Sequence, residues 1–168
     1  EAIRAVEVNT AAFEATSDAV CRRLLAFGCA PHVAADLVSV WLRRDDFLLA
    51  SLDGTFDFVV GNPPYVRQER IPESLLAEYR RRYHTVYDRA DLYVPFYERG
   101  LSLLAEGGRL GFICANRWLK NKYGGPLREF AARQFSLRYF IDLAGSPALQ
   151  ADVIAYPAIT IFERGGEQ

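Results

Sequence analysis

Four consecutive residues offer the clearest chemistry in the sequence: Asn62, Pro63, Pro64 and Tyr65. The side-chain amide of Asn62 and the carbonyl group of Pro63 accept hydrogen bonds, and the two prolines stiffen the loop because each fixes its own φ angle. Two rigid acceptors beside an aromatic plate can hold both hydrogens of a ring-bound amino group while that ring stacks on Tyr65. An Asn-Pro pair also begins many ordinary turns, but a turn explains neither the second proline nor the aromatic residue.

Such a loop suits the transfer of a group to an exocyclic amine. The lone pair of an amine such as N6 of adenine is delocalised into its ring, so the nitrogen is a poor nucleophile. Two acceptors that draw on its hydrogens favour a pyramidal nitrogen whose lone pair points at an electrophile, which combines electrostatic preorganisation with positioning. The three cysteines lack the spacing of a metal site, so we expect no metal.

The loop follows a predicted strand, Phe56–Val60, and strands alternate with helices around it. The other predicted strands are Ile3–Val8, Asp36–Leu42, Arg109–Ala115, Leu137–Leu143 and Ala158–Phe162, and the predicted helices are Ala11–Phe27, Pro72–Tyr83, Leu92–Ala105 and Pro126–Gln134. This alternation predicts an α/β fold with a mostly parallel sheet. Ligands bind at the carboxyl ends of the strands in such sheets, which is where Asn62 stands.

The composition is that of a globular domain: 168 residues and 18.9 kDa, 51% apolar and 24% charged. The net charge is −1, so any contact with nucleic acid depends on a local basic patch. No apolar run reaches the roughly 18 residues that a membrane span needs, and we expect no membrane partner. The sequence contains no Met and its first predicted strand begins at Ile3, so we expect residues 1–168 to be part of a longer protein.

The loop 62–65 resembles the signature loop of S-adenosylmethionine-dependent amino methyltransferases. The wider sequence is similar to the adenine-N6 DNA methyltransferases of restriction-modification systems, in the group where modification and cleavage often share one chain. Protein-glutamine methyltransferases share the loop, so the order of the further segments carries the resemblance. These segments run nearly end to end and are Glu7, Asp46–Leu48, Asp91–Phe96, Gly107–Ile113 and Asp152–Ile159.

The resemblance implies a Rossmann-like class I methyltransferase fold. It also implies a site-specific DNA methyltransferase that transfers a methyl group from S-adenosyl-L-methionine to N6 of an adenine flipped out of double-stranded DNA. In that function Asn62, Pro63, Pro64 and Tyr65 form the catalytic loop. The implied cofactor-binding residues are Glu7 at the ribose hydroxyls, Asp46 at the adenine amino group, its neighbour Phe47, and Leu92 and Phe96 in the adenine pocket. Burial preferences alone favour plain core packing for Phe96.

The sequence departs from the family at two points. The glycine-rich cofactor loop and the strand that leads into it would precede residue 1, so we expect a partial catalytic domain over 1–168, also without a target-recognition region. We expect such a piece to bind the cofactor weakly and to self-associate. Leu149 stands about where the family has the aromatic residue that sandwiches the flipped base with Tyr65.

The segment 66–89 is the candidate DNA-facing insertion. Its arginines fit either phosphate contacts or a solvated helix, and Tyr79, Tyr83 and Tyr87 recur every four residues as a core stripe would. The candidate DNA-binding residues are Arg67 and Arg70, with Lys120 and Lys122 as a second phosphate site.

Two other functions remain open on the sequence. One is a protein- or RNA-directed amino methyltransferase that uses the same loop. The other is a non-catalytic structural domain of a restriction assembly. On the first reading, the expected partners are DNA and a restriction nuclease or specificity region in the same parent chain, and the expected location is the cytoplasm of a prokaryote.

Overall fold

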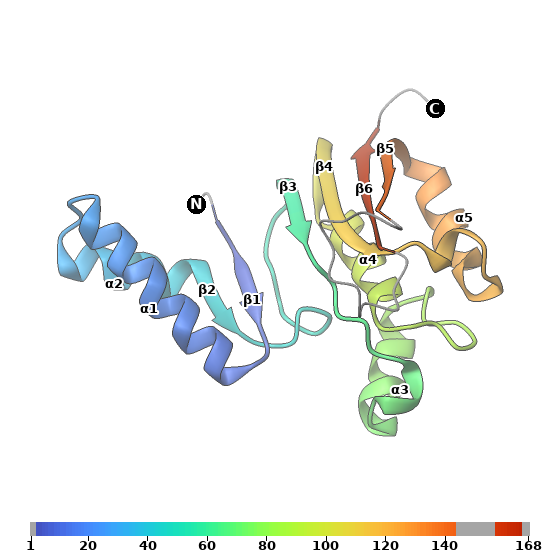
Figure 1. The fold of residues 1–168 in the computed structure, drawn as a ribbon, viewed down its shortest axis with the longest axis horizontal. Helices are drawn as coiled ribbons and strands as arrows, with labels where there is room; N and C mark the ends of the chain where they lie inside the picture. The colour runs from blue at the N-terminus through green and yellow to red at the C-terminus, as the bar shows by residue number, and fades with distance from the viewer. Residues whose placement is uncertain (1–2, 144–156, 166–168) are drawn as a thin grey trace. The chain divides into compact units, whose positions relative to one another are not determined.

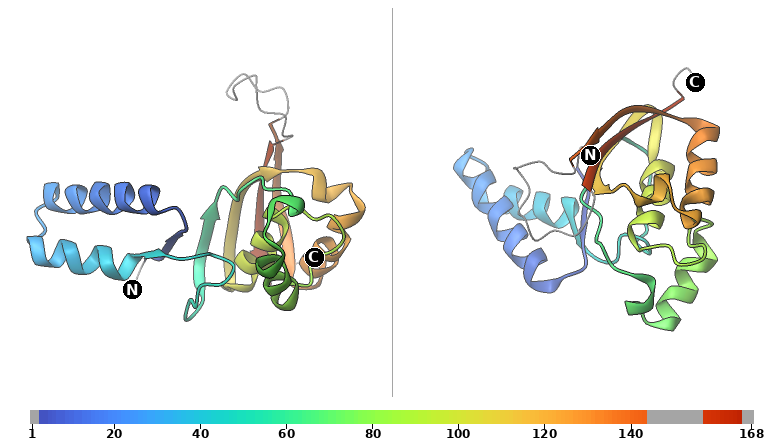
Figure 2. Two further views of the ribbon diagram at one scale, coloured as in Figure 1. Left: turned by 90° about the horizontal axis from the view of Figure 1, so that it is seen from below. Right: turned by 45° about the vertical axis from the view of Figure 1, so that its right-hand side comes forward.

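The first of two compact units ends at Leu52 and contains a helical hairpin and a two-stranded sheet. The computed structural model describes residues 3–143 and 157–165. Within the first unit the elements are β1 (Ala5–Glu7), α1 (Thr10–Ala26), α2 (Pro31–Trp41) and β2 (Leu42–Arg44) (Figure 1). The strands β1 and β2 are parallel, and the helices α1 and α2 lie side by side (Figure 2). Helix α1 begins where the side chain of Asn9 accepts a hydrogen bond from the backbone N–H of Ala12 at 2.9 Å.

The predicted strand Asp36–Leu42 is wrong, because all but its last residue belongs to helix α2. The helix begins with Pro31, whose fixed φ angle suits a first turn. Ala34, Val38 and Trp41 recur at helical spacing, and they are buried or half-buried. Only Leu42 is in a strand, at the first residue of β2.

The second unit is built on a four-stranded sheet with the order β3-β4-β6-β5 (Figure 1). Its strands are β3 (Phe56–Gly61), β4 (Leu104–Ala115), β5 (Phe135–Asp142) and β6 (Pro157–Arg164). β3 and β4 are parallel, and β6 is antiparallel to both of its neighbours. Three of the four strands therefore run in one direction, which confirms the predicted mostly parallel sheet.

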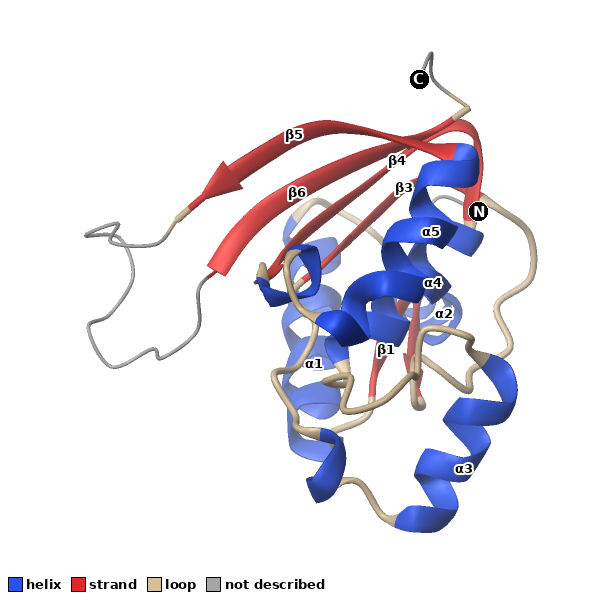
Figure 3. Ribbon diagram, turned by 90° about the vertical axis from the view of Figure 1, so that its right-hand side faces the viewer, coloured by secondary structure: helices blue, strands red, loops and turns tan. Residues whose placement is uncertain are grey.

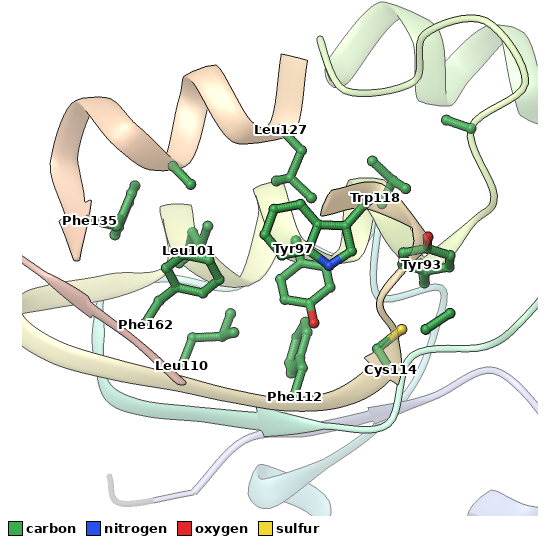
Figure 4. Close-up of a cluster of buried hydrophobic side chains, with 14 of the residues drawn as sticks. Tyr93, Tyr97, Leu101, Leu110, Phe112, Cys114, Trp118, Leu127, Phe135 and Phe162 are labelled. Atoms are coloured by element: carbon green, nitrogen blue, oxygen red, sulfur yellow. The ribbon is translucent and has the colours of Figure 1, made fainter. Parts of the chain in front are cut away.

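Helices cover one face of this sheet (Figure 3). They are α4 (Tyr93–Ser102) and α5 (Gly125–Gln134), while α3 (Glu73–Arg82) lies farther from the sheet (Figure 3). Single 3-10 turns occur at η1 (Gln68–Arg70), η2 (Arg117–Leu119) and η3 (Lys122–Gly124). The hydrophobic core lies between the sheet and helices α4 and α5 (Figure 4). Its largest members include Tyr93, Tyr97, Leu101, Leu110, Phe112, Trp118 and Phe162.

Strand β4 begins earlier than predicted. Helix α4 ends at Ser102, before the predicted end at Ala105, and residues 106–108 between the predicted helix and the predicted strand lie inside β4. The pairing jumps from Phe56 opposite Leu104 to Phe58 opposite Arg109, so β4 bulges between these pairs. Gly107 has a φ of +75°, a conformation that L side chains rarely adopt, which explains a glycine in this bulge.

In the part of the chain that the structure describes, no helix has the length and apolar character to cross a membrane. Apolar side chains instead gather on the sheet of the second unit, where several are exposed. They are Phe58 and Val60 on β3 and Leu137, Tyr139, Phe140 and Ile141 on β5.

Candidate active site

The loop 62–65 leaves the carboxyl end of β3 as predicted. Asn62 is exposed, and its side-chain amide makes no hydrogen bond with any described residue. Pro63 is buried while Pro64 is exposed, so the first proline anchors the loop to the protein. The Asn62 amide is therefore available to a ligand at the place where α/β sheets bind theirs.

Tyr65 presents a half-exposed ring at the end of the same loop, with 45% of its surface accessible. Burial of the remainder, together with the nearby Cys114 thiol, raises the pKa of its phenol to about 12. The hydroxyl is therefore protonated at physiological pH. Tyr65 can offer a neutral ring face for stacking, and it is unsuited to act as a base.

The start of helix α4 is tied to this loop. The backbone N–H of Leu92 donates to the carbonyl group of Val66 at 2.8 Å, which brings the predicted cofactor segment 91–96 next to the catalytic loop. Leu92 and Phe96 are half-buried, and Phe96 packs against the hydrophobic core. Packing therefore accounts for part of the Phe96 ring, and its contact with a cofactor stays a prediction.

Asp91 is a half-buried carboxyl at this junction. Burial raises its pKa, while the guanidinium groups of Arg117 and Arg67 act in the opposite direction. Arg67 lies two residues after the catalytic loop, and Arg117 begins the turn η2 after β4. Two other segments of the second unit thus place charged side chains near the first residue of the cofactor segment.

The first unit places two predicted carboxylates at the carboxyl ends of its parallel strands. Glu7 ends β1, and Asp46 follows β2 by two residues. The carbonyl group of Glu7 accepts from the N–H of Asp45 at 3.2 Å, so the two strand ends are held together. The Glu7 carboxylate accepts from the N–H of Asn9 at 2.7 Å, and the Asp46 carboxylate accepts from the N–H of Leu48 at 2.8 Å. Phe47, the residue after Asp46, is half-buried.

The basic residues of the insertion fall into two groups. Arg67 and Arg70 are exposed at η1 beside the catalytic loop, and neither forms an ion pair with a described residue. In α3, Glu78 accepts hydrogen bonds from both Arg81 and Arg82, which lower its pKa to about 2. Arg81 and Arg82 therefore pair with an acidic residue of their own helix, as on an ordinary solvated helix face. Arg67 and Arg70 remain the better candidates for phosphate binding.

The predicted tyrosine stripe is partly correct. Tyr79 and Tyr83 are buried, whereas Tyr87 is 47% exposed. Tyr87 lies past the end of α3, beside Asp88 at a φ of +54°, so the helical spacing no longer applies there.

Lys120 and Lys122 lie exposed in the loop 116–124 that joins β4 to α5. Because β3 and β4 are parallel neighbours, this loop leaves the same edge of the sheet as the catalytic loop. The guanidinium of Arg128 donates to the carbonyl groups of Trp118 and Asn121 and so fixes the loop's course. A Cβ at Gly124 would collide with the Trp118 carbonyl oxygen, so the chain can pass there only as glycine.

Sequence reasoning missed Tyr93, Tyr123 and Arg128, which support the loops without belonging to a chemical motif. The Gly124-Gly125 pair was the available signal, since paired glycines indicate close backbone approach. Two further predictions fall on residues outside the described ranges: Leu149 and the first part of the 152–159 match, of which only Pro157–Ile159 is described, in β6. Among the described residues, no cluster of three His, Cys, Asp or Glu side chains could hold a metal ion.

Comparison with known proteins assigns the chain to a family. The model of the Eco57I restriction-modification methylase family matches residues 29–148. The chain belongs to this family. It is 57% identical over 166 residues to the type II methyltransferase M.PaeR7I of Pseudomonas aeruginosa and 58% identical over 163 residues to M.XhoI of Xanthomonas vasicola.

These alignments cover 99% and 97% of this chain, but the chain spans only 29% and 30% of the two relatives. The fold also has a solved counterpart. A class I S-adenosylmethionine-dependent methyltransferase structure from Listeria monocytogenes aligns with a TM-score of 0.62 at 17% identity, covering 82% of this chain and 43% of that one. The fold is therefore the Rossmann-like fold of class I methyltransferases, as predicted.

Proposed function

We propose that this methylase domain serves a site-specific DNA methyltransferase that modifies N6 of adenine. The observation that carries the proposal is the catalytic loop at the end of β3: an exposed, unbonded Asn62 amide, a stiff proline pair and the half-exposed neutral ring of Tyr65. Membership of the restriction-modification methylase family supports methyl transfer as the reaction class.

The loop would act on an adenine that has left the base stack, because N6 cannot be reached inside a duplex. The side-chain oxygen of Asn62 and the carbonyl oxygen of Pro63 accept the two N6 hydrogens, and the base stacks on Tyr65. This arrangement raises the nucleophilicity of N6 and aims its lone pair. The nitrogen gains the methyl carbon and releases one of its protons, so the product amine is neutral.

Bound S-adenosyl-L-methionine supplies a methyl group activated by its sulfonium. The donor set fits this cofactor: the half-buried carboxylates of Glu7 and Asp46 can accept hydrogen bonds from hydroxyl and amino groups. Half-buried Phe47, Leu92 and Phe96 offer apolar surface to the adenine ring. We propose these five residues as the cofactor-binding set.

The proposed nucleic-acid partner is double-stranded DNA, whose phosphates meet Arg67 and Arg70 beside the catalytic loop. Lys120 and Lys122 form the second phosphate site on the neighbouring loop. A restriction-modification methylase also implies a nuclease partner and a specificity region. The proposed function places the protein with the chromosome in a prokaryotic cytoplasm.

A methyl-transfer assay tests the proposal. The full-length protein is incubated with S-adenosylmethionine carrying a tritiated methyl group and with double-stranded DNA, RNA or a protein extract in separate reactions. We expect label only in the DNA, recovered as N6-methyl-2′-deoxyadenosine after digestion to nucleosides. Label in RNA or protein would establish one of the two alternative substrates, and no label in any reaction would favour a structural role.

A further inference from the structure

The ring of Tyr65 has an aromatic neighbour that no motif assigned. Tyr93, the first residue of α4, lies with its ring centroid 6.4 Å from that of Tyr65 at an interplanar angle of 53°. Tyr93 is fully buried, with no accessible surface (Figure 4). Because Tyr65 is half-exposed and Tyr93 is buried, the ring of Tyr93 has less freedom to move than the ring of Tyr65.

The hydroxyl group of Tyr93 is held in turn from the neighbouring loop. It lies 3.0 Å from the hydroxyl of Tyr123 in η3, so each buried or half-buried oxygen has a hydrogen-bond partner. Burial, together with this hydrogen bond, raises the pKa of Tyr93, so the hydroxyl of Tyr93 stays protonated. A buried hydroxyl needs such a partner, since leaving it unpaired destabilises the fold.

The loop that carries Tyr123 is itself fixed. Gly124 passes against the carbonyl oxygen of Trp118, and Arg128 donates to that same oxygen and to the carbonyl group of Asn121. Tyr123 therefore sits on a rigid support. A continuous set of contacts runs from the loop 116–124 through Tyr123 and Tyr93 to the ring of Tyr65.

We propose that Tyr123 and Tyr93 are positioning residues, whose hydroxyl pair sets the orientation of the Tyr93 ring and thereby the place of Tyr65. The inference rests on the proposed function, in which Tyr65 stacks on the target base. It adds that the loop bearing Lys120 and Lys122 influences the position of the Tyr65 ring through the hydrogen bond between Tyr123 and Tyr93. Neither tyrosine touches the substrate in this account.

Removing one partner of a buried hydrogen bond is more harmful than removing both, and this difference supplies the test. Tyr123→Phe leaves the Tyr93 hydroxyl buried without its partner, so the ring must shift to relieve it. The double variant Tyr93→Phe/Tyr123→Phe removes both hydroxyls, leaves no unpaired group and allows the original ring packing. We expect Tyr123→Phe in the full-length protein to lower kcat by about 5- to 10-fold with an unchanged KM for S-adenosylmethionine, and the double variant to recover to within about twofold.

Thr160→Val is the matched control. Thr160 pairs its hydroxyl with that of buried Tyr97 at 2.6 Å in the same core, and the ring contacts of Tyr97 are with Phe112, Trp118 and Phe162. This variant should lower the melting temperature as Tyr123→Phe does and leave kcat unchanged. An equal fall of kcat in the control, or a Tyr123→Phe variant with normal kcat, would overturn the positioning role.

A second measurement separates this inference from the proposed function. Fluorotyrosine placed at position 65 reports the surroundings of that ring by fluorine NMR without any substrate. Its resonance should move in Tyr123→Phe and return in the double variant. If the wild-type protein does not methylate DNA but the resonance behaves in this way, the proposed function fails and the positioning stands; a resonance that never moves refutes the positioning alone.

Discussion

Asn62 and Tyr65 are neighbours in the catalytic loop, but the protein holds them differently. The amide of Asn62 projects from a proline-stiffened backbone and bonds to no described side chain or backbone group. The ring of Tyr65 instead packs against the buried ring of Tyr93, and the nearby Cys114 thiol contributes to the raised pKa of Tyr65. Substitutions at the two positions should therefore fail in different ways.

Replacing Asn62 by Ala should abolish most methyl transfer while leaving the fold intact. The variant loses one of the two acceptors that shape the amine, and the loss of such a group lowers kcat by ~10²-fold or more. Thermal unfolding should not change, because the side chain is exposed. Asn121→Ala, an exposed amide on the neighbouring loop, is the control and should keep its activity. Near-normal turnover by Asn62→Ala would exclude the proposed role.

Tyr65→Phe should keep most activity, whereas Tyr65→Ala should lose roughly 1–3 kcal/mol of base stacking, about 5- to 150-fold in rate. Because the phenol pKa lies at about 12, the hydroxyl does not titrate in the working range. The pH–rate profiles of the wild-type and Tyr65→Phe proteins should then superimpose up to pH ~10. If Phe damages catalysis as much as Ala, the hydroxyl has a role that stacking does not explain.

At the scale of elements, the segment between the catalytic loop and α4 is hydrogen-bonded to α4 at one place and exposes a charged helix face at another. The carboxylate of Glu98 on α4 accepts from the backbone N–H of Thr85 at 2.9 Å and from that of His84 at 3.3 Å. Tyr79 of α3 is buried. The exposed face of α3 carries arginines paired with acidic residues of the same helix, so this face contributes to helix stability more than to phosphate binding.

The Glu78 ion pairs predict an acid-sensitive helix. Arg81 and Arg82 lower the folded-state pKa of Glu78 to about 2 from 4.5, so its stabilising effect is complete above pH 4.5 and is lost as the pH falls toward 2. Glu78→Gln should be less stable than wild type at pH 7, and the difference should vanish across this window. Thermal unfolding between pH 7 and pH 2.5 measures it. Glu73→Gln, which breaks only the longer 3.5 Å pair with Arg80, should change less; an equal effect would contradict the assignment.

At the scale of the whole molecule, the sheet of the second unit ends in β3 on one side and β5 on the other. Among the described residues, β3 pairs only with β4. Its Phe58 and Val60 are 72% and 81% exposed. A strand with an unpaired edge and exposed apolar side chains is a template for pairing with another chain.

A protein consisting of residues 1–168 should therefore self-associate. Light scattering should show species larger than a monomer that grow with concentration. Val60→Lys should reduce them, because a charge on an edge strand opposes pairing. Leu25→Lys replaces an exposed apolar side chain of helix α1, where no strand edge exists, and should have little effect. A monomer at all concentrations would show that the edge of β3 is not a pairing surface.

The catalytic loop and its place after a strand could be predicted because they depend on local chemistry: prolines fix φ angles, and a short apolar run precedes them. Helix α2 was mistaken for a strand because Val38 and Val40 favour strands locally, and its helical form depends on packing against α1. The Tyr93–Tyr123 pair joins residues 30 positions apart, so no local pattern could indicate it. Apart from α2, the type of each predicted element followed from spacing, whereas the contacts between elements did not.

The close approach of Gly124 to the Trp118 carbonyl has a consequence for how the family's variation would look. The backbone at Trp118 cannot yield, because Arg128 donates to that same oxygen. Natural selection would thus remove almost every amino-acid substitution at position 124, although the residue has no side chain. A glycine that only lets the chain pass would then appear as invariant as a catalytic residue, and its invariance would report the packing of a loop.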